Sequence, residues 1–290
     1  MSLPQFPEFK FIELEDAGIL AERIGRHPSE VCEFHFANIF PWRHYERSKL
    51  TAINGNLCIL CEPTSEPAYF LQPIGDNDLE ATIRTCLSFA PRISRAEESF
   101  AARYGRSFRC DADRDNFDYV YLTEDLIGLK GKKYDGKRNR IRKFEKSFSY
   151  EYEPLFSEHL SGCRELLARW IELKAGSDGF LANLWREVIE EGLTHLPEIG
   201  LKGGVFRVAG RVAAFSLGTR LTSETAVIPI EIVDPGYDGL SQLVNREFVR
   251  REWAGFRFIN REQDNGIAGL RRAKTSYHPH HFVKKYNIWG

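Results

Sequence analysis

The end of the chain gathers charged side chains that could form a reaction centre or pair with one another in salt bridges. The stretch "NREQDNGIAGLRRAKTSYHP", residues 260–279, directly follows an apolar run with the character of a strand. Asp264 could hold an ammonium group of a substrate. Arg271 and Lys274 are three residues apart, so on a helix they would be neighbours and could face a carbonyl oxygen or a phosphate together. Groups of these kinds can place a charged substrate and stabilise negative charge that develops during a reaction.

A second carboxylate belongs to an earlier strand. Glu231 lies near the end of the apolar run "ETAVIPIEIV", residues 224–233. We expect Glu231 and Asp264 to lie side by side where two strands part, and to hold an ammonium group of the donor or the acceptor. The alternative is an internally paired cluster, in which Asp264 binds Arg271 or Lys274 and no ligand is involved.

Further polar residues of the closing stretch would complete this site. Tyr277 offers a hydroxyl for proton relay, and Asn260 and Arg261 could orient the carboxylates. Gly266 and Gly269 would let the backbone approach a ligand closely. The predicted catalytic residues are therefore Glu231, Asp264, Arg271, Lys274 and Tyr277, and the predicted substrate-binding residues are Asn260, Arg261, Gly266 and Gly269.

A basic run in the middle of the chain could bind an anion. Residues 129–146, "LKGKKYDGKRNRIRKFEK", hold nine Lys or Arg against Asp135 and Glu145. Several phosphate contacts from such a run would give salt-dependent affinity for a nucleic acid. The alternative is a solvated helix face. The candidates for anion or nucleic-acid binding are Lys132, Lys133, Lys137, Arg138 and Arg140.

Composition limits the other possibilities. The 290 residues carry a net charge of −1, so any attraction to a polyanion must be local, and 42% hydrophobic residues can fill packed cores. Apolar runs fall far short of the roughly 20 residues of a membrane-spanning helix, and the acidic start is unlike a secretory signal. We therefore expect a cytoplasmic protein without a membrane-spanning segment. We expect no metal site, since Cys58 and Cys61 would point to opposite faces of a strand.

The elements that must position these residues alternate between strands and helices. Leu166, Leu167 and Trp170 recur at helical spacing, and so do apolar residues of the stretch 180–193. Two apolar runs meet at Ala209-Gly210, which predicts a strand hairpin. Another strand, a helix, a strand and a short helix follow. The first half of the chain has a weaker version of the same content, so the fold class is α/β (α+β).

Three motifs carry a resemblance to a known family. They are "FHFANIFPWRHY", "DYVYLTEDLIGLKGKKYDGKRNRIRKF" and "INREQDNGIAGLRRAKTSYHP". The chain resembles soluble proteins related to the C-terminal catalytic domain of phosphatidylglycerol lysyltransferases. In such relatives the long strand usually ends on Glu-Lys-Ala, whereas Glu231 is followed by Ile232 and Val233, so the expected cation beside the carboxylate is missing.

This resemblance implies a fold and an activity. The fold would be two tandem GNAT-like acyltransferase domains with mixed central sheets flanked by helices, as in the Fem-type peptidyl transferases. We expect residues 1–140 to form the first domain and residues 141–290 the second, which would carry the active site. The activity would be transfer of an amino acid from aminoacyl-tRNA to a small-molecule, lipid or peptide acceptor.

The loop that would bind coenzyme A does not favour that cofactor. A GNAT enzyme holds the pyrophosphate with backbone N–H groups at a helix N-terminus. Here the corresponding turn is residues 234–239, where Asp234 and Asp238 would repel phosphate and Pro235 lacks an N–H. We therefore favour aminoacyl-tRNA over acetyl-CoA or another acyl-CoA. The alternatives are a CoA-dependent N-acyltransferase and a binding protein that retains the fold without turnover.

Overall fold

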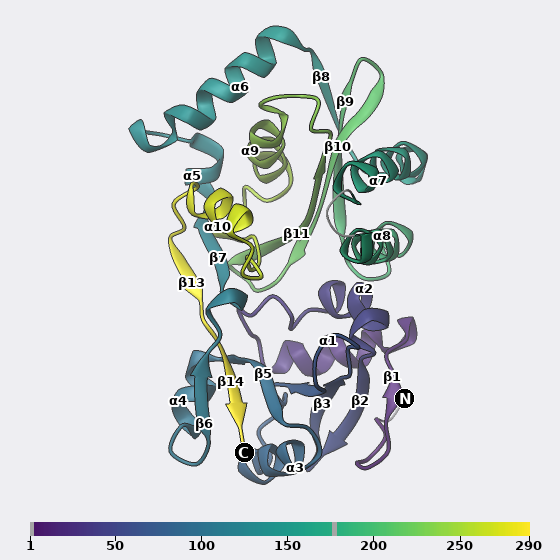
Figure 1. Ribbon diagram of the computed structural model, residues 1–290, viewed down its shortest axis with the longest axis vertical. Helices are drawn as coiled ribbons and strands as arrows, with labels where there is room; N and C mark the ends of the chain where they lie inside the picture. The colour runs from purple at the N-terminus through teal and green to yellow at the C-terminus, as the bar shows by residue number, and fades with distance from the viewer. Residues whose placement is uncertain (1–2, 176–178) are drawn as a thin grey trace. The chain divides into compact units, whose positions relative to one another are not determined.

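The chain forms two compact units, each built around one seven-stranded sheet (Figure 1). The structure is a computed structural model that describes residues 3–175 and 179–290. The first unit consists of Met1–Tyr119, Glu262–Arg272 and Phe282–Gly290, and the second of Val120–Arg261 and Ala273–His281.

The first unit places its strands in the order β1-β2-β3-β4-β5-β14-β6. The strands are β1 (Lys10–Phe11), β2 (Lys49–Ile53), β3 (Asn56–Cys61), β4 (Tyr69–Leu71), β5 (Arg92–Glu97), β14 (Lys285–Trp289) and β6 (Arg109–Ala112). The helices are α1 (Ala17–Arg26), α2 (Phe36–Glu46), α3 (Leu79–Phe89) and α4 (Glu98–Tyr104). Leu60, Phe70 and Ile93 of the sheet pack with Ile83 of α3 in a buried core.

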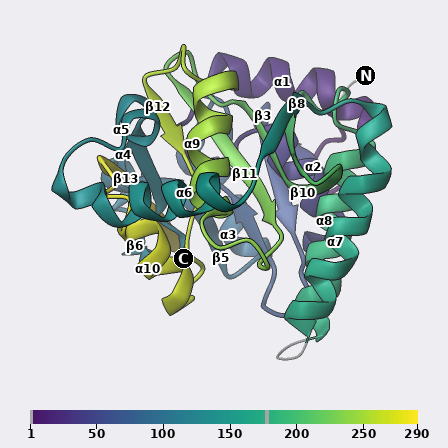
Figure 2. The ribbon, with the colours of Figure 1, turned by 90° about the horizontal axis from the view of Figure 1, so that it is seen from above.

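The second unit places its strands in the order β13-β7-β12-β11-β10-β9-β8. The strands are β13 (His281–Val283), β7 (Asp118–Leu122), β12 (Phe258–Asn260), β11 (Thr225–Val233), β10 (Arg211–Arg220), β9 (Lys202–Val208) and β8 (Tyr150–Pro154). The helices are α5 (Thr123–Gly128), α6 (Asp135–Ser147), α7 (Leu160–Ala175), α8 (Gly179–Thr194), α9 (Leu240–Glu252) and α10 (Ala268–Thr275). Helices α7 and α8 cover one face of the sheet, and α9 covers the other (Figure 2).

Local sequence explains several of these elements. Ala209 and Gly210 both adopt positive φ angles, as a tight two-residue turn between β9 and β10 requires. Leu166 and Leu167 of α7 and Ile189 of α8 are buried, as their helical spacing predicted. The predicted α/β class, with mixed sheets flanked by helices, is confirmed.

The two sheets repeat one pattern. In each, a single adjacent pair of strands with known register is parallel: β4 with β5, and β11 with β12. Each pair encloses one helix in the chain, α3 or α9. The strand next to the parallel pair comes from the other half of the chain, because β14 lies between β5 and β6 while β7 lies between β12 and β13. The two halves thus exchange one strand each.

This exchange explains why the compact units differ from the expected division at residue 140. Residues 120–122 of β7 pair with residues 258–260 of β12, so the chain joins the second unit from Val120 onward. The C-terminal β14 pairs with both β5 and β6 and so returns to the first unit. A division based on the order of elements along the chain had no means of finding pairings so distant in sequence.

A buried ammonium group ties β14 to the first unit. Lys285 is fully buried, and its Nζ donates to Asp118 Oδ1 at 2.7 Å and to Glu33 Oε2 at 2.5 Å, with Cys32 Sγ at 3.5 Å. Cys32, Glu33 and Asp118 lie close enough together to ligate a metal ion, but the ammonium group already fills their centre. Burial alone would lower the pKa of Lys285, yet Asp118, Cys32 and Glu33 raise it. Lys285 therefore stays charged.

Replacing this lysine tests how much the first unit depends on it. We expect Lys285→Met to lower the free energy of unfolding by about 3–5 kcal/mol, because Asp118 and Glu33 would remain buried without their cation. Urea unfolding followed by circular dichroism measures the change. The matched control is Lys284→Met, which removes an exposed ion pair with Glu98 and should change stability far less than Lys285→Met. Equal stabilities for the two variants would contradict this role of Lys285.

Candidate active site

Two parallel strands of the second unit part after a short contact. Strand β11 pairs with β12 only from Thr225 to Val227, opposite Phe258 to Asn260. Beyond Val227, β11 continues to Val233 along β10 alone. Parting strands leave side chains and backbone groups without a neighbouring strand, which creates room for a ligand.

Glu231 lies on the unpaired part of β11 and contacts a buried arginine. Arg261 follows directly after β12, and its Nη2 lies 3.5 Å from Glu231 Oε2, with both side chains only about 15% exposed. Asn245 of α9, with its amide oxygen toward the guanidinium, accepts from Arg261 Nε and Nη1 at 3.3 and 3.2 Å. Burial opposes the charge of Arg261, but Glu231 raises its pKa. A cation therefore does lie beside the Glu231 carboxylate. It is Arg261, which follows β12, and not the residue after Glu231.

Three buried polar atoms on β10, on β11 and after α10 lack a hydrogen-bond partner in the part of the chain that the structure describes. They are Ser216 Oγ, Glu231 Oε2 and Tyr277 Oη. The contact of Glu231 with Arg261 has the distance of an ion pair without hydrogen-bond geometry. Ser216 is the direct partner of Glu231 in the register of β10 and β11, so both side chains leave the same face of the sheet. Unpaired buried groups are rare, and they indicate a place for water or a polar ligand.

Tyr277 faces two cations. The guanidinium carbon of Arg261 lies 5.2 Å from the centre of the Tyr277 ring, and Lys137 Nζ of α6 lies 4.0 Å from it. Burial raises the pKa of the Tyr277 phenol. At neutral pH the hydroxyl therefore keeps its proton and can donate a hydrogen bond.

Lys137 brings a lysine of unusual acidity to the same place. Burial, followed by the nearby charges of Arg261 and Arg140, lowers the pKa of Lys137 to about 8. Its Nζ donates to Ser276 Oγ at 2.6 Å. A lysine with this pKa is neutral often enough near pH 8 to accept a proton.

Lys274 supports this site through the backbone. Its Nζ donates to the carbonyl oxygen of Arg261 at 2.5 Å, and its own carbonyl accepts from Tyr121 Oη at 2.8 Å. Lys274 thus fixes the segment that carries Arg261. Asn260, the last residue of β12, is fully buried beside it.

Asp264 and Arg271 belong to the first unit and bind each other. This is the internal ion pair that the sequence analysis gave as the alternative to ligand binding. Asp264 is fully buried and accepts from Arg271 Nε at 2.9 Å and Nη2 at 2.8 Å, and from Tyr119 Oη at 2.6 Å. Gly266 donates its N–H to the same carboxylate at 2.9 Å and has a positive φ of 72°, so this glycine forms a turn. An ideal Cβ on Gly269 would meet nothing within 4 Å.

The five predicted catalytic residues therefore divide between the units. Glu231, Lys274 and Tyr277 lie in the second unit, and Asp264 and Arg271 in the first. Their joint convergence stays a prediction. Sequence reasoning did not assign Ser216, Asn245 or Lys137 to this site. The strand register could have identified Ser216, whereas the positions of Asn245 and Lys137 depend on how α9 and α6 pack.

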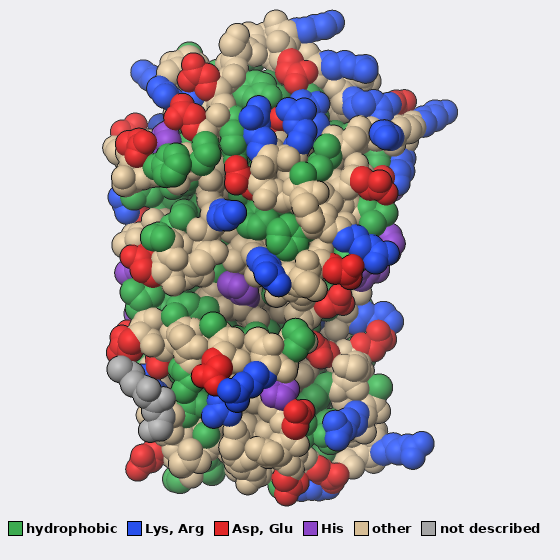
Figure 3. Space-filling view, turned by 180° about the vertical axis from the view of Figure 1, so that it is seen from behind, with side chains coloured by type: hydrophobic (Ala, Val, Ile, Leu, Met, Phe, Trp, Pro, Cys, Tyr) green, Lys and Arg blue, Asp and Glu red, His purple; other side chains and the backbone are tan. Residues whose placement is uncertain are grey.

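The basic residues of the run 129–146 have different surroundings. Arg138 donates to the carbonyls of Leu129 and Gly131 and so fixes the start of α6. Lys133 lies 3.5 Å from Asp125. Lys132 and Arg140 are exposed. Figure 3 shows Lys and Arg side chains gathered at the top of the view, the end of the second unit where α6 lies in Figure 1.

Helix α6 also touches the loop before α9. Gly239, which precedes α9, has a positive φ of 94°, and an ideal Cβ there would come within 2.2 Å of the carbonyl oxygen of Arg140. Lys143 Nζ lies 2.8 Å from Asp238. The first turn of α9 is thus in close contact with backbone and charged side chains of α6.

The sequence matches a known protein family over most of its length. The model of the family described as "Phosphatidylglycerol lysyltransferase, C-terminal" matches residues 25–289. The chain belongs to this family. A search among curated proteins gave no significant match.

Members and neighbours of this family share the fold. A conserved protein of unknown function from Bacteroides thetaiotaomicron is 28% identical over 99% of each chain, with a TM-score of 0.89. The C-terminal domain of a candidate lysylphosphatidylglycerol synthetase from Agrobacterium fabrum is 13% identical over 95% of this chain and 91% of that one, with a TM-score of 0.66. FemX is 9% identical, with 97% and 96% covered and a TM-score of 0.57. The predicted tandem GNAT, Fem-like fold is confirmed. Of the helices described, none has the length and apolar character needed to cross a membrane.

The buried carboxylate of Asp264 predicts a pH dependence of stability. Burial alone would raise its pKa, but hydrogen bonds from Arg271, Tyr119 and Gly266 lower it to about 2. Because the unfolded value is about 4, the stabilisation is complete above pH ~4 and is lost as the pH falls through 2. We expect Asp264→Asn to lower the free energy of unfolding at pH 7 by about 2–3 kcal/mol, and the difference from wild type to shrink between pH 4 and 2.

The control is Asp115, which binds the same Arg271 as Asp264 but is exposed to solvent. Asp115 is 60% exposed and binds Arg271 Nη2 at 2.6 Å. Asp115→Asn should cost less than about 1 kcal/mol, with little change in the acid range. A constant difference between Asp264→Asn and wild type from pH 7 to 2, measured by urea unfolding, would rule out the low pKa of Asp264.

Proposed function

We propose that the protein transfers an aminoacyl group from aminoacyl-tRNA to an amine or hydroxyl of a small-molecule, lipid or peptide acceptor. Family and fold fit a transferase of the lysyl-phosphatidylglycerol synthase and Fem type. The observation that carries the proposal is the set of three unpaired buried groups, Ser216 Oγ, Glu231 Oε2 and Tyr277 Oη, beside the parting strands β11 and β12.

Glu231 and Tyr277 of this set, together with Arg261 and Lys137, suit the requirements of attack by an amine or hydroxyl on an ester. Glu231 carries a charge that attracts the α-ammonium of the aminoacyl donor. The nucleophile of the acceptor attacks the ester carbonyl and forms the new C–N or C–O bond, while the bond to the ribose oxygen of the tRNA breaks. Tyr277 and Arg261 can donate to the oxygen on which negative charge develops. The proton of the nucleophile is taken up by neutral Lys137, and the ribose oxygen finally receives one.

The loop before α9 supports a donor other than coenzyme A. A pyrophosphate would need the N–H groups of this first turn. Close contact of the Arg140 carbonyl with Gly239 leaves little room there, and Asp234 and Asp238 add negative charge. CoA-dependent N-acylation therefore remains the second candidate, and aminoacyl-tRNA is the donor that we favour.

The charge of α6 supports a polyanionic donor. Lys132 and Arg140 are exposed, and Lys137 lies at the site itself. A nucleic acid lying along α6 could therefore reach the parting strands with its 3′ end. Because charged tRNA is made in the cytoplasm, this donor would also place the reaction there.

A transfer assay tests the proposed reaction. Radiolabelled aminoacyl-tRNAs are incubated with cell extract and protein, and label that leaves the tRNA for another molecule is counted. We expect enzyme-dependent transfer from at least one aminoacyl-tRNA, and a loss of about 10²–10³-fold in kcat/KM for Glu231→Gln, because the donor ammonium loses its charged partner.

The control for Glu231 is Glu224, a carboxylate at the opposite end of β11. Glu224 is 61% exposed just before β11, and Glu224→Gln should transfer at close to the wild-type rate. Transfer from acetyl-CoA with none from any aminoacyl-tRNA would replace this proposal by N-acylation. Wild-type activity of Glu231→Gln would remove Glu231 from the site.

The role of Lys137 predicts a pH profile. Its lowered pKa means that the neutral amine becomes the major form above pH ~8, so kcat should rise with pH and level off near that value. Lys137→Arg keeps the charge and removes the proton acceptor, so we expect a loss of about 10²-fold and no rising limb. Lys146→Arg, on the exposed end of α6, is the control and should keep both rate and profile. A profile of Lys137→Arg that matches the wild type would assign proton transfer to another group.

A further inference from the structure

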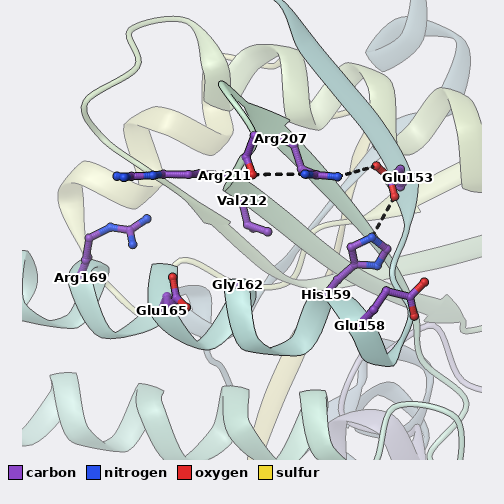
Figure 4. A pocket seen from close by; sticks show the side chains of 10 residues that line it. Glu153, Glu158, His159, Gly162, Glu165, Arg169, Arg207, Arg211 and Val212 are labelled. Atoms are coloured by element: carbon purple, nitrogen blue, oxygen red, sulfur yellow. Dashed lines mark hydrogen bonds and ion pairs between the residues drawn. The ribbon is translucent and has the colours of Figure 1, made fainter.

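The second unit has a cavity apart from the parting strands. A volume of about 640 Å³ lies between the start of α7 and the strands β8, β9 and β10 (Figure 4). Cavities of this size hold small ligands in many proteins. Gly162 of α7 faces Val212 of β10 here, at a distance that leaves no room for a Cβ. The cavity therefore lies on the face of the sheet that α7 covers.

Glu231 points to the opposite face. Ile230, its neighbour on β11, lies next to Gly192 of α8, so Ile230 points to the face of α7 and α8. Successive residues of a strand alternate between faces, and Glu231 therefore points to the face of α9, which also carries Asn245. The cavity and the candidate active site are thus separate places.

One end of the cavity is a fixed polar chain. His159 is buried, its Nδ1 accepts from the N–H of Phe156 at 3.0 Å, and its Nε2 lies 2.9 Å from Glu153 Oε2. Arg207 Nη1 lies 3.3 Å from Glu153 Oε1 and its Nη2 donates to the carbonyl of Gly210 at 3.2 Å. Hydrogen bonds from His159 and Arg207 lower the pKa of Glu153, so this carboxylate is charged at neutral pH.

The other end presents two guanidinium groups to open space. Figure 4 shows Arg169 of α7 and Arg211 of β10 extending to the same side, with no hydrogen bond or ion pair to the other residues drawn. Arg169 has a distant ion partner, Asp234, at 3.8 Å. Within the described residues, the Arg211 guanidinium has no partner in a hydrogen bond or ion pair. Two such groups facing one space favour an oxyanion, since guanidinium groups bind carboxylate and phosphate well.

Two further carboxylates border the same space. The carboxylates of Glu158 and Glu165 are exposed and form no hydrogen bond or ion pair within the described ranges. In Figure 4, Glu165 lies on α7 between Gly162 and Arg169, whereas Glu158 lies at the His159 end and points away from Arg169 and Arg211. With Glu153 they balance the three arginines, so the charged lining of the cavity is neutral. A simple anion would meet these carboxylates, and a simple cation would meet Arg169 and Arg211. Val212 is the one aliphatic side chain among the lining residues, so a ligand with an apolar tail would have little to contact.

We propose that this cavity binds a small zwitterion, with its oxyanion on Arg169 and Arg211 and its ammonium group on Glu165. The oxyanion is a carboxylate, as in an amino acid or short peptide, or a phosphate, as in phosphoethanolamine. This site does not depend on the proposed transfer reaction, because it uses other residues on another face of the sheet.

Isothermal titration with two probes tests the site and distinguishes the two sources. Glycylglycine carries a carboxylate and phosphoethanolamine a phosphate, each together with an ammonium group. We expect saturable binding of at least one, and its identity assigns the oxyanion. N-acetylglycylglycine and ethyl phosphate lack the ammonium group and should bind at least about tenfold more weakly than the parent probe.

Variants connect the binding to the named residues. The double variant Arg169→Gln/Arg211→Gln, and separately Glu165→Gln, should each weaken binding of the parent probe by about tenfold or more. Arg186→Gln, on the exposed face of α8, removes the same charge elsewhere and should leave the affinity unchanged. Thermal unfolding and circular dichroism verify that all variants fold.

Three outcomes would overturn the proposal. The first is no binding of either probe to the folded wild-type protein. The second is equal binding of the probes with and without the ammonium group, which would leave a plain anion site. The third is unchanged affinity in the arginine double variant, or an equal loss in Arg186→Gln, which would separate the binding from this cavity.

Discussion

The short parallel contact between β11 and β12 is the constraint on which the candidate active site depends. Three residues of each strand hold the pair together, and then β11 continues along β10 without β12. A longer contact would pair the backbone beside Glu231 and close the space around it. Because the strands part directly after Asn260, Arg261 is placed across the gap from Glu231 rather than on the surface. The unpaired polar atoms of the site follow from this geometry.

The first unit has an equivalent short parallel contact, between β4 and β5, but the arginine after it is surrounded by ion pairs. Leu71 pairs with Ser94 as Val227 pairs with Asn260, so Arg95 and Arg261 occupy matching positions directly after the parallel register. Arg95 contacts two carboxylates of its own unit, Glu33 at 3.1 Å and Asp113 at 3.5 Å, and Glu33 also binds Lys285. The arginine is thus present in both repeats, but the first unit surrounds it with internal ion pairs. This repeat was visible in the order of elements and invisible in the residues, since strand pairing can persist while the side chains change.

Local signals predicted much of the second unit. Helical spacing in α7 and α8, the turn at Ala209-Gly210 and the strand that carries Glu231 depend on neighbouring residues, and the structure has all of them. The site was predictable only in part. Arg261 and Tyr277 were expected near Glu231, whereas Ser216 and Asn245 contribute through strand register and helix packing, which no short segment specifies.

Charge alone could not separate a ligand-binding carboxylate from a structural one. Glu231 and Asp264 looked alike in sequence, as acidic residues among apolar and basic neighbours. The difference lies in the partners: Asp264 accepts from Arg271, Tyr119 and the Gly266 amide, while Glu231 Oε2 has no hydrogen bond from a described residue. Tyr119 and Asp264 are more than a hundred residues apart in the chain. A hydrogen bond between segments so distant cannot be predicted from the local sequence.

The exchange of β7 and β14 has a consequence for synthesis on the ribosome. Strand β14 is an interior strand of the first sheet, between β5 and β6, yet in the chain it follows every strand of the second sheet and is translated after them. Until it leaves the exit tunnel, β5 and β6 have open edges, and the carboxylates of Glu33 and Asp118 lack the Lys285 ammonium group. The amino-terminal half of this polypeptide therefore cannot complete its structure while the remainder is being made, and nascent chains must be kept from pairing through those edges with one another.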